Sequence, residues 1–167
     1  MEVSAFIHES RYNKLKFLSK KSNSFISWFC PLLTAVYFDD KQYIYSQGED
    51  VSFICFLLKG EAGFVLPVYE NTTYIKISQG DHFGEIDILG SASTNDFEEN
   101  EWYKNKDLLQ RQFTAMALNY TEVLNLTITD LSRMEKEFYD YYEIILKSGH
   151  LRLRQALKTK LKAIKQC

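Results

Sequence analysis

The stretch that decides the fold is Gly80-Asp-His-Phe-Gly-Glu-Ile-Asp-Ile-Leu89, followed later by Arg111-Gln-Phe-Thr-Ala-Met-Ala117. It places Gly84 and Glu85 at the start of a short helical turn, and it places Arg111 at the opening of a strand. Backbone N–H groups at a helix N-terminus bind anions, and an arginine fork matches two phosphate oxygens. A carboxylate accepts a hydrogen bond from a hydroxyl group. The stretch therefore predicts a site for a ligand that carries both a phosphate and a hydroxyl.

Short strand patterns separated by turn residues surround this stretch. Apolar and aromatic runs end at pairs such as Asp39-Asp40 and Lys59-Gly60, and glycines recur at positions 48, 60, 80 and 90. This spacing is typical of an all-β barrel or roll. The predicted strands cover residues 33–38, 43–46, 53–58, 63–69, 73–77, 112–118 and 122–128.

Helical patterns flank the strands on both sides. Residues 12–29 carry apolar side chains at near-helical spacing, and Pro31 marks the end of that helix because it cannot continue it. The last stretch is again helical, capped by Thr129 or Asp130, until Gly149 interrupts it and a second helix follows. The chain is therefore divided into an N-terminal helical segment (1–31), a β-roll (32–128, with an insert at 90–110) and C-terminal helices (129–167).

Composition argues against several kinds of partner. A net charge of −2 over 167 residues gives no argument for nucleic acid or for an acidic membrane surface. The longest uninterrupted apolar run, residues 53–58, is far too short to cross a bilayer, so no membrane span is expected. Cys30, Cys55 and Cys167 lack metal-ligand spacing and are expected to be reduced thiols, which favours a cytoplasmic location, either for a separate protein or for the cytoplasmic part of a membrane protein.

Catalysis is not expected either. His8, His82 and His150 are scattered along the chain, and neither a nucleophile–base pair nor a metal cluster emerges. The sequence therefore predicts no catalytic residue and no metal ligand. The last helix is basic, and its charges are interpreted first as a solvated face and alternatively as a contact to acidic lipid or calmodulin-like partners or as the start of a following domain. The residues are Lys147, Arg152, Arg154, Lys158, Lys160, Lys162 and Lys165.

Taken as a set, the motifs resemble the cyclic-nucleotide-binding domain family, which includes the regulatory subunits of cAMP-dependent kinase and cyclic-nucleotide-gated channels. Residues 43–49 resemble the strand and turn that precede closure of the roll in this family. Residues 56–60 resemble the family's next strand and the glycine that follows it. Residues 83–89 resemble the front of its phosphate-binding cassette, and 111–117 the back. The motifs keep the family's order over about residues 24–146. The resemblance implies an α+β fold that is mainly β: an eight-stranded, jelly-roll-like β-roll with an N-terminal helix, a short cassette helix and C-terminal helices.

The same resemblance implies a cyclic nucleotide, cAMP or cGMP, as the ligand and no other cofactor. Gly84 and Glu85 would hold the ribose, the backbone of Ile86 and Asp87 the phosphate, and Arg111 its charge. The full set of expected ligand-binding residues is Phe83, Gly84, Glu85, Ile86, Asp87, Arg111, Gln112 and Thr114, with Ile75, Ile77, Leu153 and Leu157 at the base pocket.

Structural interpretations stand beside these roles. Ile75 and Ile77 are equally well explained as plain core, and Gly84 as a turn residue. The segment after Gly149 is expected to swing over the base, with Leu153 or Leu157 as the capping side chain, and a helix that stays packed is the equal alternative.

Three features depart from the family's pattern. The insert at 90–110 is polar and acidic, which predicts a solvated loop or, alternatively, a lid in which Trp102 or Tyr103 stacks on the purine. Asp87 stands where the family has a small residue, and a carboxylate beside a phosphate weakens binding unless its side chain points away or pairs with a cation. Gln112 stands where cGMP-selective members carry threonine, which leans towards cAMP.

Two functions follow from these observations. The first is a cyclic-nucleotide-binding regulatory domain that transmits occupancy through its C-terminal helices, as part of an ion channel or kinase-type regulator. Its partners would be the nucleotide, other subunits or a covalently linked channel or kinase portion. The alternative is a degenerate homology domain that acts as a ligand-free interaction scaffold, as in some voltage-gated potassium channels. Glu85 and Arg111 favour the first function, whereas Asp87 and the insert favour the second.

Overall fold

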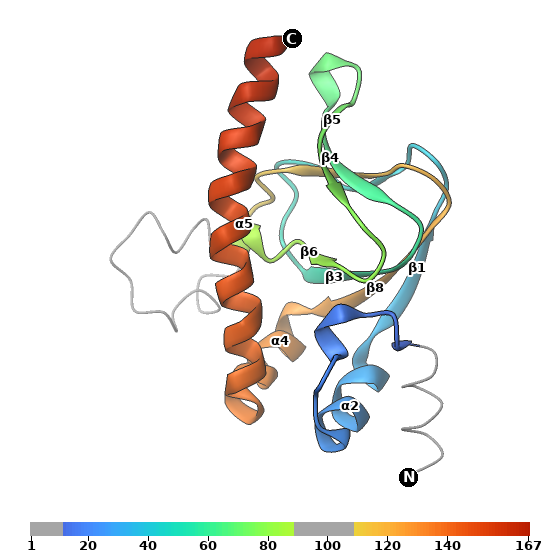
Figure 1. The fold of residues 1–167 in the computed structure, drawn as a ribbon, viewed down its shortest axis with the longest axis vertical. Coiled ribbons are helices and arrows are strands. Elements are labelled where there is room, and N and C mark those ends of the chain that lie inside the picture. Colours follow the sequence, from blue (N-terminus) through green and yellow to red (C-terminus); the bar gives the residue numbers. More distant parts are fainter. Residues whose placement is uncertain (1–11, 89–108) are drawn as a thin grey trace.

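Two four-stranded antiparallel sheets form the roll at the centre of the molecule (Figure 1). The computed structural model describes residues 12–88 and 109–167 of the chain. Its strands are β1 (Thr34–Phe38), β2 (Tyr43–Tyr45), β3 (Phe53–Lys59), β4 (Ala62–Leu66), β5 (Thr72–Ile77), β6 (His82–Phe83), β7 (Thr114–Ala117) and β8 (Thr121–Thr127). The sheet orders are β1-β8-β3-β6 and β2-β7-β4-β5. The expected eight-stranded, mainly β roll with flanking helices is confirmed.

The central strand β3 explains why residues 53–58 form an apolar run. Side chains alternate between the two faces of a strand. Ile54, Phe56 and Leu58 point into a core cluster shared with the helices, whereas Cys55 and Leu57 point into a second cluster inside the roll. Both faces of β3 are therefore covered, and a strand covered on both faces reads as a continuous hydrophobic run.

The N-terminal segment departs from the single helix predicted over 12–29. The chain forms a 3-10 turn at Lys16–Leu18, then helix α2 at Asn23–Phe29 and a second 3-10 turn at Cys30–Leu32. Two local features end the helical pattern between Leu18 and α2. Lys20 has a positive φ of 61°, and the hydroxyl of Ser22 caps α2 by accepting the N–H of Phe25 at 3.2 Å.

The C-terminal helices also break at a different place from the one predicted. Helix α4 spans Ile128–Glu137 and helix α5 spans Tyr139–Gln166, so the interruption lies at Phe138 and not at Gly149. Glycine in a helix interior costs about 1 kcal/mol relative to alanine, and burial of Gly149, together with Ile145 and Leu153 on the same helix, offsets that cost. The cap of α4 is Thr127, whose hydroxyl accepts the N–H of Asp130, instead of Thr129 or Asp130.

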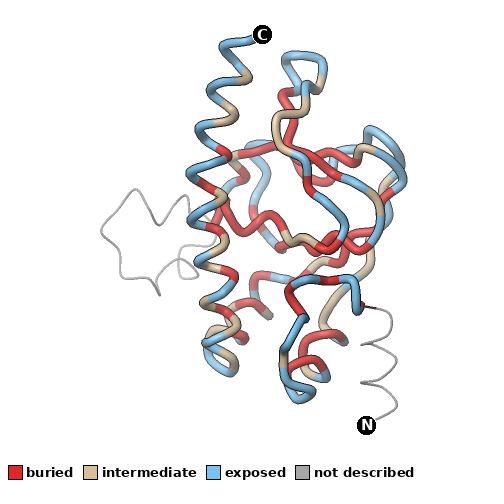
Figure 2. Tube along the Cα trace, viewed as in Figure 1, coloured by how far each residue is buried: buried red, intermediate tan, exposed pale blue. Residues whose placement is uncertain are grey.

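Helix α5 joins the two core clusters. Near its start it packs with α2 through an aromatic group, in which the Phe25 and Tyr141 ring centroids are 4.6 Å apart. Tyr142 and Ile145 belong to the helical cluster, while Leu153 and Ala156 belong to the cluster inside the roll. Figure 1 shows α5 running past the side of the roll, and Figure 2 shows that its last turns are largely exposed. In the described parts of the chain, each helix is too short or too polar to span a bilayer.

Candidate functional site

The predicted cassette begins on the short strand β6, which the sequence patterns did not reveal as a strand. Cys55 of β3 pairs with Phe83 of β6, and residues 86–88 then begin a helical turn. Gly84, between them, has a φ of 94°, and a Cβ added to it would lie 2.9 Å from Nη1 of Arg111. Glycine is needed here because of the backbone conformation and because the arginine side chain lies against it.

A cavity of about 210 Å³ lies between the cassette, β5 and α5. Its walls combine apolar side chains, which suit a flat ring system, with several charged groups. The lining residues that were predicted from sequence are Ile75, Ile77, Phe83, Gly84, Glu85 and Ile86. Those that were not are Phe64, Lys76, Asp81, Arg152, Gln155 and Ala156.

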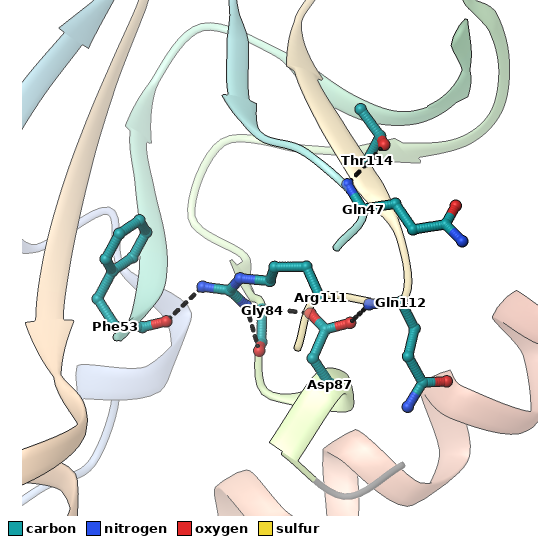
Figure 3. A network of polar contacts seen from close by, with 7 residues as sticks. All are labelled: Gln47, Phe53, Gly84, Asp87, Arg111, Gln112 and Thr114. Carbon is teal, nitrogen blue, oxygen red and sulfur yellow. Dashed lines mark hydrogen bonds and ion pairs between the residues drawn. The ribbon is translucent and has the colours of Figure 1, made fainter. Parts of the chain in front are cut away.

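The remaining polar residues of the predicted site form a separate buried network around Arg111 (Figure 3). Arg111 is 2% exposed, and its Nη1 donates to the carbonyl oxygen of Gly84 at 2.8 Å and to Oδ2 of Asp87 at 3.0 Å. Its Nη2 donates to the carbonyl oxygen of Phe53, and its guanidinium lies 3.9 Å from the ring centroid of Tyr45. The arginine is therefore held from several sides by the protein itself.

Asp87 is the charged partner that holds Arg111 in place. The carboxylate is 1% exposed, and its second oxygen, Oδ1, accepts the backbone N–H of Gln112 at 2.6 Å. Burial raises the pKa of Asp87, while the guanidinium of Arg111 and the N–H of Gln112 oppose that shift. The carboxylate thus connects the two halves of the predicted cassette across the insert.

Thr114 and Gln112 contact neighbouring segments of the fold. The hydroxyl of Thr114 accepts the N–H of Gln47 at 3.0 Å (Figure 3). The carbonyl oxygen of Gln112 accepts a bond from Nζ of Lys160 at 3.2 Å. Lys160 lies on α5, so this basic residue contacts the site, and its interpretation as part of a solvated face was wrong.

Glu85 connects the cavity to α5 through a second basic residue that the sequence interpretation missed. Glu85 is 2% exposed, and its Oε1 accepts a bond from Nη1 of Arg152 at 3.3 Å, while Arg152 also donates to the carbonyl oxygen of His82. The other carboxylate oxygen, Oε2, has no hydrogen-bond donor among the described residues. The only sequence signal for Arg152 was its place in a basic helix, which does not identify a partner.

Burial shifts the pKa values of two neighbours in opposite directions. Desolvation raises the pKa of Glu85 from 4.5 to about 7, against the attraction of Arg152. Desolvation lowers the pKa of His82 from 6.5 to about 3, so its imidazole is neutral at physiological pH. Nε2 of His82 lies 3.9 Å from Oε1 of Glu85. Both shifts have the same cause, because a low-polarity surrounding favours the uncharged form of either group.

The structure separates the two leucines that were predicted to cap the base. Leu153 is 7% exposed and belongs to the cluster inside the roll, whereas Leu157 is 44% exposed on α5. Neither appears among the residues that line the cavity. In the observed position of α5, its contributions to the cavity wall are Arg152, Gln155 and Ala156.

Two further expectations concern metals and the insert. Within residues 12–88 and 109–167, three or more His, Cys, Asp or Glu side chains nowhere gather in a way that would hold a metal ion. Most of the insert, including Trp102 and Tyr103, lies outside the described residues, so its role as a loop or a lid stays a prediction. Its described end places Leu109 in the core and pairs Gln110 with Asp50.

Known proteins match this chain in structure but not in sequence. No protein-family model matches the sequence, and no curated protein matches it by sequence. A cAMP-bound PfPKA-R fragment (141–441) matches with a TM-score of 0.65 and 18% identity over 94% of this chain. This chain spans 47% of that fragment.

Two further structures match over most of both chains. The PKAR CBD2 domain bound to Sp-2Cl-cAMPS has a TM-score of 0.64 and 17% identity, and the match covers 97% of this chain and 92% of that one. A candidate cyclic-nucleotide-binding protein from Geobacter metallireducens GS-15 has a TM-score of 0.63 and 11% identity, over 89% and 96% of the two chains. At these identities the similarity establishes a shared fold.

Proposed function

We propose that this chain, which has the fold of cyclic-nucleotide-binding domains, is a regulatory domain that binds a cyclic nucleotide and signals its occupancy through α5. One observation carries the proposal. Glu85 is a buried carboxylate on the cavity wall, with one oxygen bonded to Arg152 of α5 and the other without a donor among the described residues. A ligand hydroxyl that donates to the second oxygen would join the cavity directly to α5.

The ligand in this proposal lies with its base against Ile75 and Ile77 and its ribose hydroxyl at Glu85. A buried acceptor without a donor costs about 1–3 kcal/mol, and a hydroxyl bound to Oε2 would recover that free energy. The phosphate would lie toward the backbone of Ile86 and Asp87 and toward Arg111, as the sequence resemblance implies. The apolar walls of the cavity support the base position, since ring systems bind well in such surroundings.

The proposed response of α5 follows from shared contacts. Arg152, Gln155 and Ala156 form one wall of the cavity, so a bound ligand touches the helix directly. A ligand moves a conformational equilibrium only as far as its affinity differs between the two states. A ribose hydroxyl that binds Oε2 of Glu85 supplies such a difference, because the other oxygen of that carboxylate is held by Arg152 of α5 and the hydroxyl bond therefore depends on the position of the helix.

The finer features of the function are also proposals. Gln112, in place of threonine, supports a modest preference for cAMP over cGMP. The domain would act in the cytoplasm, without catalysis of its own, on other subunits or on a linked ion-channel or kinase-type portion. The likeness to cAMP-bound PfPKA-R supports the kinase-type setting.

Calorimetric titration with cAMP and with cGMP tests the proposal. We expect saturable binding of cAMP to the wild-type chain and a loss of about tenfold or more in affinity for Glu85→Ala, since a hydrogen bond to a charged group is removed. Glu61→Ala, at an exposed acidic residue, is the matched control and should leave affinity unchanged.

Hydrogen exchange with bound cAMP tests the response of α5 in the same samples. We expect the exchange rates around Arg152 to change on binding in the wild-type chain and not in Glu85→Ala. Binding that leaves α5 exchange unaltered would contradict transmission through this helix.

The ligand-free scaffold is the second candidate function. It is favoured by one observation, the buried bond between Arg111 and Asp87, because the arginine expected to meet a phosphate already has an anionic partner. A folded wild-type sample that binds neither nucleotide would support the scaffold over the sensor.

A further inference from the structure

The surroundings of Arg111 resemble those of a filled anion site. Its guanidinium donates to one oxygen of Asp87, and the backbone N–H of Gln112 donates to the other, at 3.0 and 2.6 Å. A guanidinium and a backbone N–H are the same kinds of donor that bind phosphate oxygens in proteins. Each oxygen of the carboxylate therefore has a donor of the kind that a bound phosphate would use.

Both arginines near the site have carboxylate partners without any ligand. Arg111 pairs with Asp87, and Arg152 pairs with Glu85, all four on residues that are buried or partly buried. A phosphate brought to Arg111 would add a negative charge next to Asp87, in surroundings where an uncompensated charge is strongly unfavourable. A phosphate can therefore bind Arg111 only if the hydrogen bond between Arg111 and Asp87 breaks.

The neutral part of a nucleotide faces no such competition. The cavity is lined by residues such as Ile75, Ile77 and Glu85, and its lining includes neither Asp87 nor Arg111. A base and ribose can therefore occupy the cavity while the Arg111–Asp87 pair stays intact. The Arg111–Asp87 pair should therefore weaken the contribution of a ligand's phosphate to binding affinity and leave the contribution of its base and ribose unchanged.

We propose that the carboxylate of Asp87 is a built-in occupant of the anion site and sets ligand specificity by making every phosphate-bearing ligand compete with it for Arg111. The proposal rests on the proposed function, because it takes the ligand to bind in the cavity next to the cassette. Asp87 is then a specificity-determining residue: it reduces the contribution of the phosphate to affinity and leaves the nucleoside part as the main source of binding.

The test compares cAMP with adenosine, which lacks the phosphate, by calorimetry on the full chain. In the wild type we expect the two affinities to agree within about threefold. In Asp87→Asn and Asp87→Ala we expect cAMP to bind about tenfold or more tightly than in the wild type, with adenosine unchanged. Asp40→Asn, at an exposed aspartate, is the matched control and should change neither affinity.

Several outcomes would overturn the proposal. Wild-type cAMP affinity about tenfold above that of adenosine would do so, because the phosphate would already gain its full contribution beside Asp87. An unchanged ratio of the two affinities in both variants would do so as well. If circular dichroism shows that neither variant folds, the wild-type ratio alone decides, since it needs no substitution.

The test also separates this proposal from the proposed function. If folded wild type and variants bind neither cAMP nor adenosine, the cyclic-nucleotide function fails, and the role of Asp87 fails with it. If the wild type binds cAMP far more tightly than adenosine, the function stands and the role of Asp87 alone is rejected.

Discussion

At the scale of single residues, His82 and Glu85 are neighbours in a buried region, and their pKa shifts make the stability of the fold depend on pH in opposite directions. The folded state lowers the pKa of His82 to about 3, so the unfolded state binds more protons at low pH and stability rises with pH up to about 6.5. The folded state raises the pKa of Glu85 to about 7, so the folded state binds more protons and stability falls as pH rises from about 4.5.

A pair of variants separates these two contributions. Between about pH 5 and 7, each residue changes the free energy of unfolding by about 2 kcal/mol, and the two changes have opposite signs. They therefore nearly cancel in the wild type. As the pH rises from about 5 to 7, the free energy of unfolding of His82→Gln should therefore fall relative to that of the wild type. The free energy of unfolding of Glu85→Gln should rise over the same range. Urea unfolding at several pH values measures both, and curves that stay parallel to the wild type would contradict the shifts.

A second residue-scale prediction concerns Gly84. Its φ of 94° disfavours any side chain, and an added Cβ would also meet Arg111 at 2.9 Å. Gly48 is the matched control, because its φ is 93° and nothing lies within 4 Å of an added Cβ. Denaturant unfolding should show a loss of about 1–2 kcal/mol for Gly48→Ala from the backbone alone. Gly84→Ala should lose more, since Arg111 must also move, and equal losses would rule out that contact.

At the scale of elements, α5 depends on its few buried residues for attachment to the roll. Leu153→Ala removes a buried side chain from the cluster inside the roll and should cost about 2–5 kcal/mol. Leu157→Ala, one turn further along and 44% exposed, should cost less than about 0.5 kcal/mol. Chemical denaturation measures both values. Similar losses for the two leucines would mean that α5 packs differently from the observed position.

At the scale of the whole molecule, α5 connects the helical core cluster to the core cluster inside the roll, and its tertiary contacts are unevenly distributed along its length. Its first half carries Tyr142 and Ile145 in the helical cluster, while its middle carries Leu153 and Ala156 in the roll interior. Beyond Ala156 the residues are largely exposed (Figure 2). The helix therefore has decreasing tertiary support from its start to its end.

This gradient predicts the order of hydrogen exchange along α5. Regions with few buried contacts open locally at low free energy. We expect amides in 157–166 to exchange faster than those in 139–149, with intermediate rates around Leu153. Exchange measured by mass spectrometry on the ligand-free chain tests this order. Uniform protection along the helix would indicate that its end packs on a surface that the described residues do not provide.

Local patterns predicted most of the elements correctly and failed at specific places. The predicted strand over 53–58 is β3, observed at Phe53–Lys59, because a short, continuous apolar run bounded by turn residues is encoded in the chain itself. The two-residue strand β6 was missed, since so short a segment carries no period. The break predicted at Gly149 was wrong, because burial of α5 against both clusters outweighs the weak helix propensity of one glycine.

The sequence by itself determined seven of the eight strands in their order, the helical segments that flank them and the cassette motif with its glycine, glutamate and arginine. Only the tertiary structure decided which charges meet. Asp87 and Arg111 are 24 residues apart, and Glu85 and Arg152 are 67 apart, yet each pair is in hydrogen-bond contact. Periodicity and propensity act over a few neighbouring residues, whereas the partner of a buried charge depends on how distant segments are brought together and removed from water.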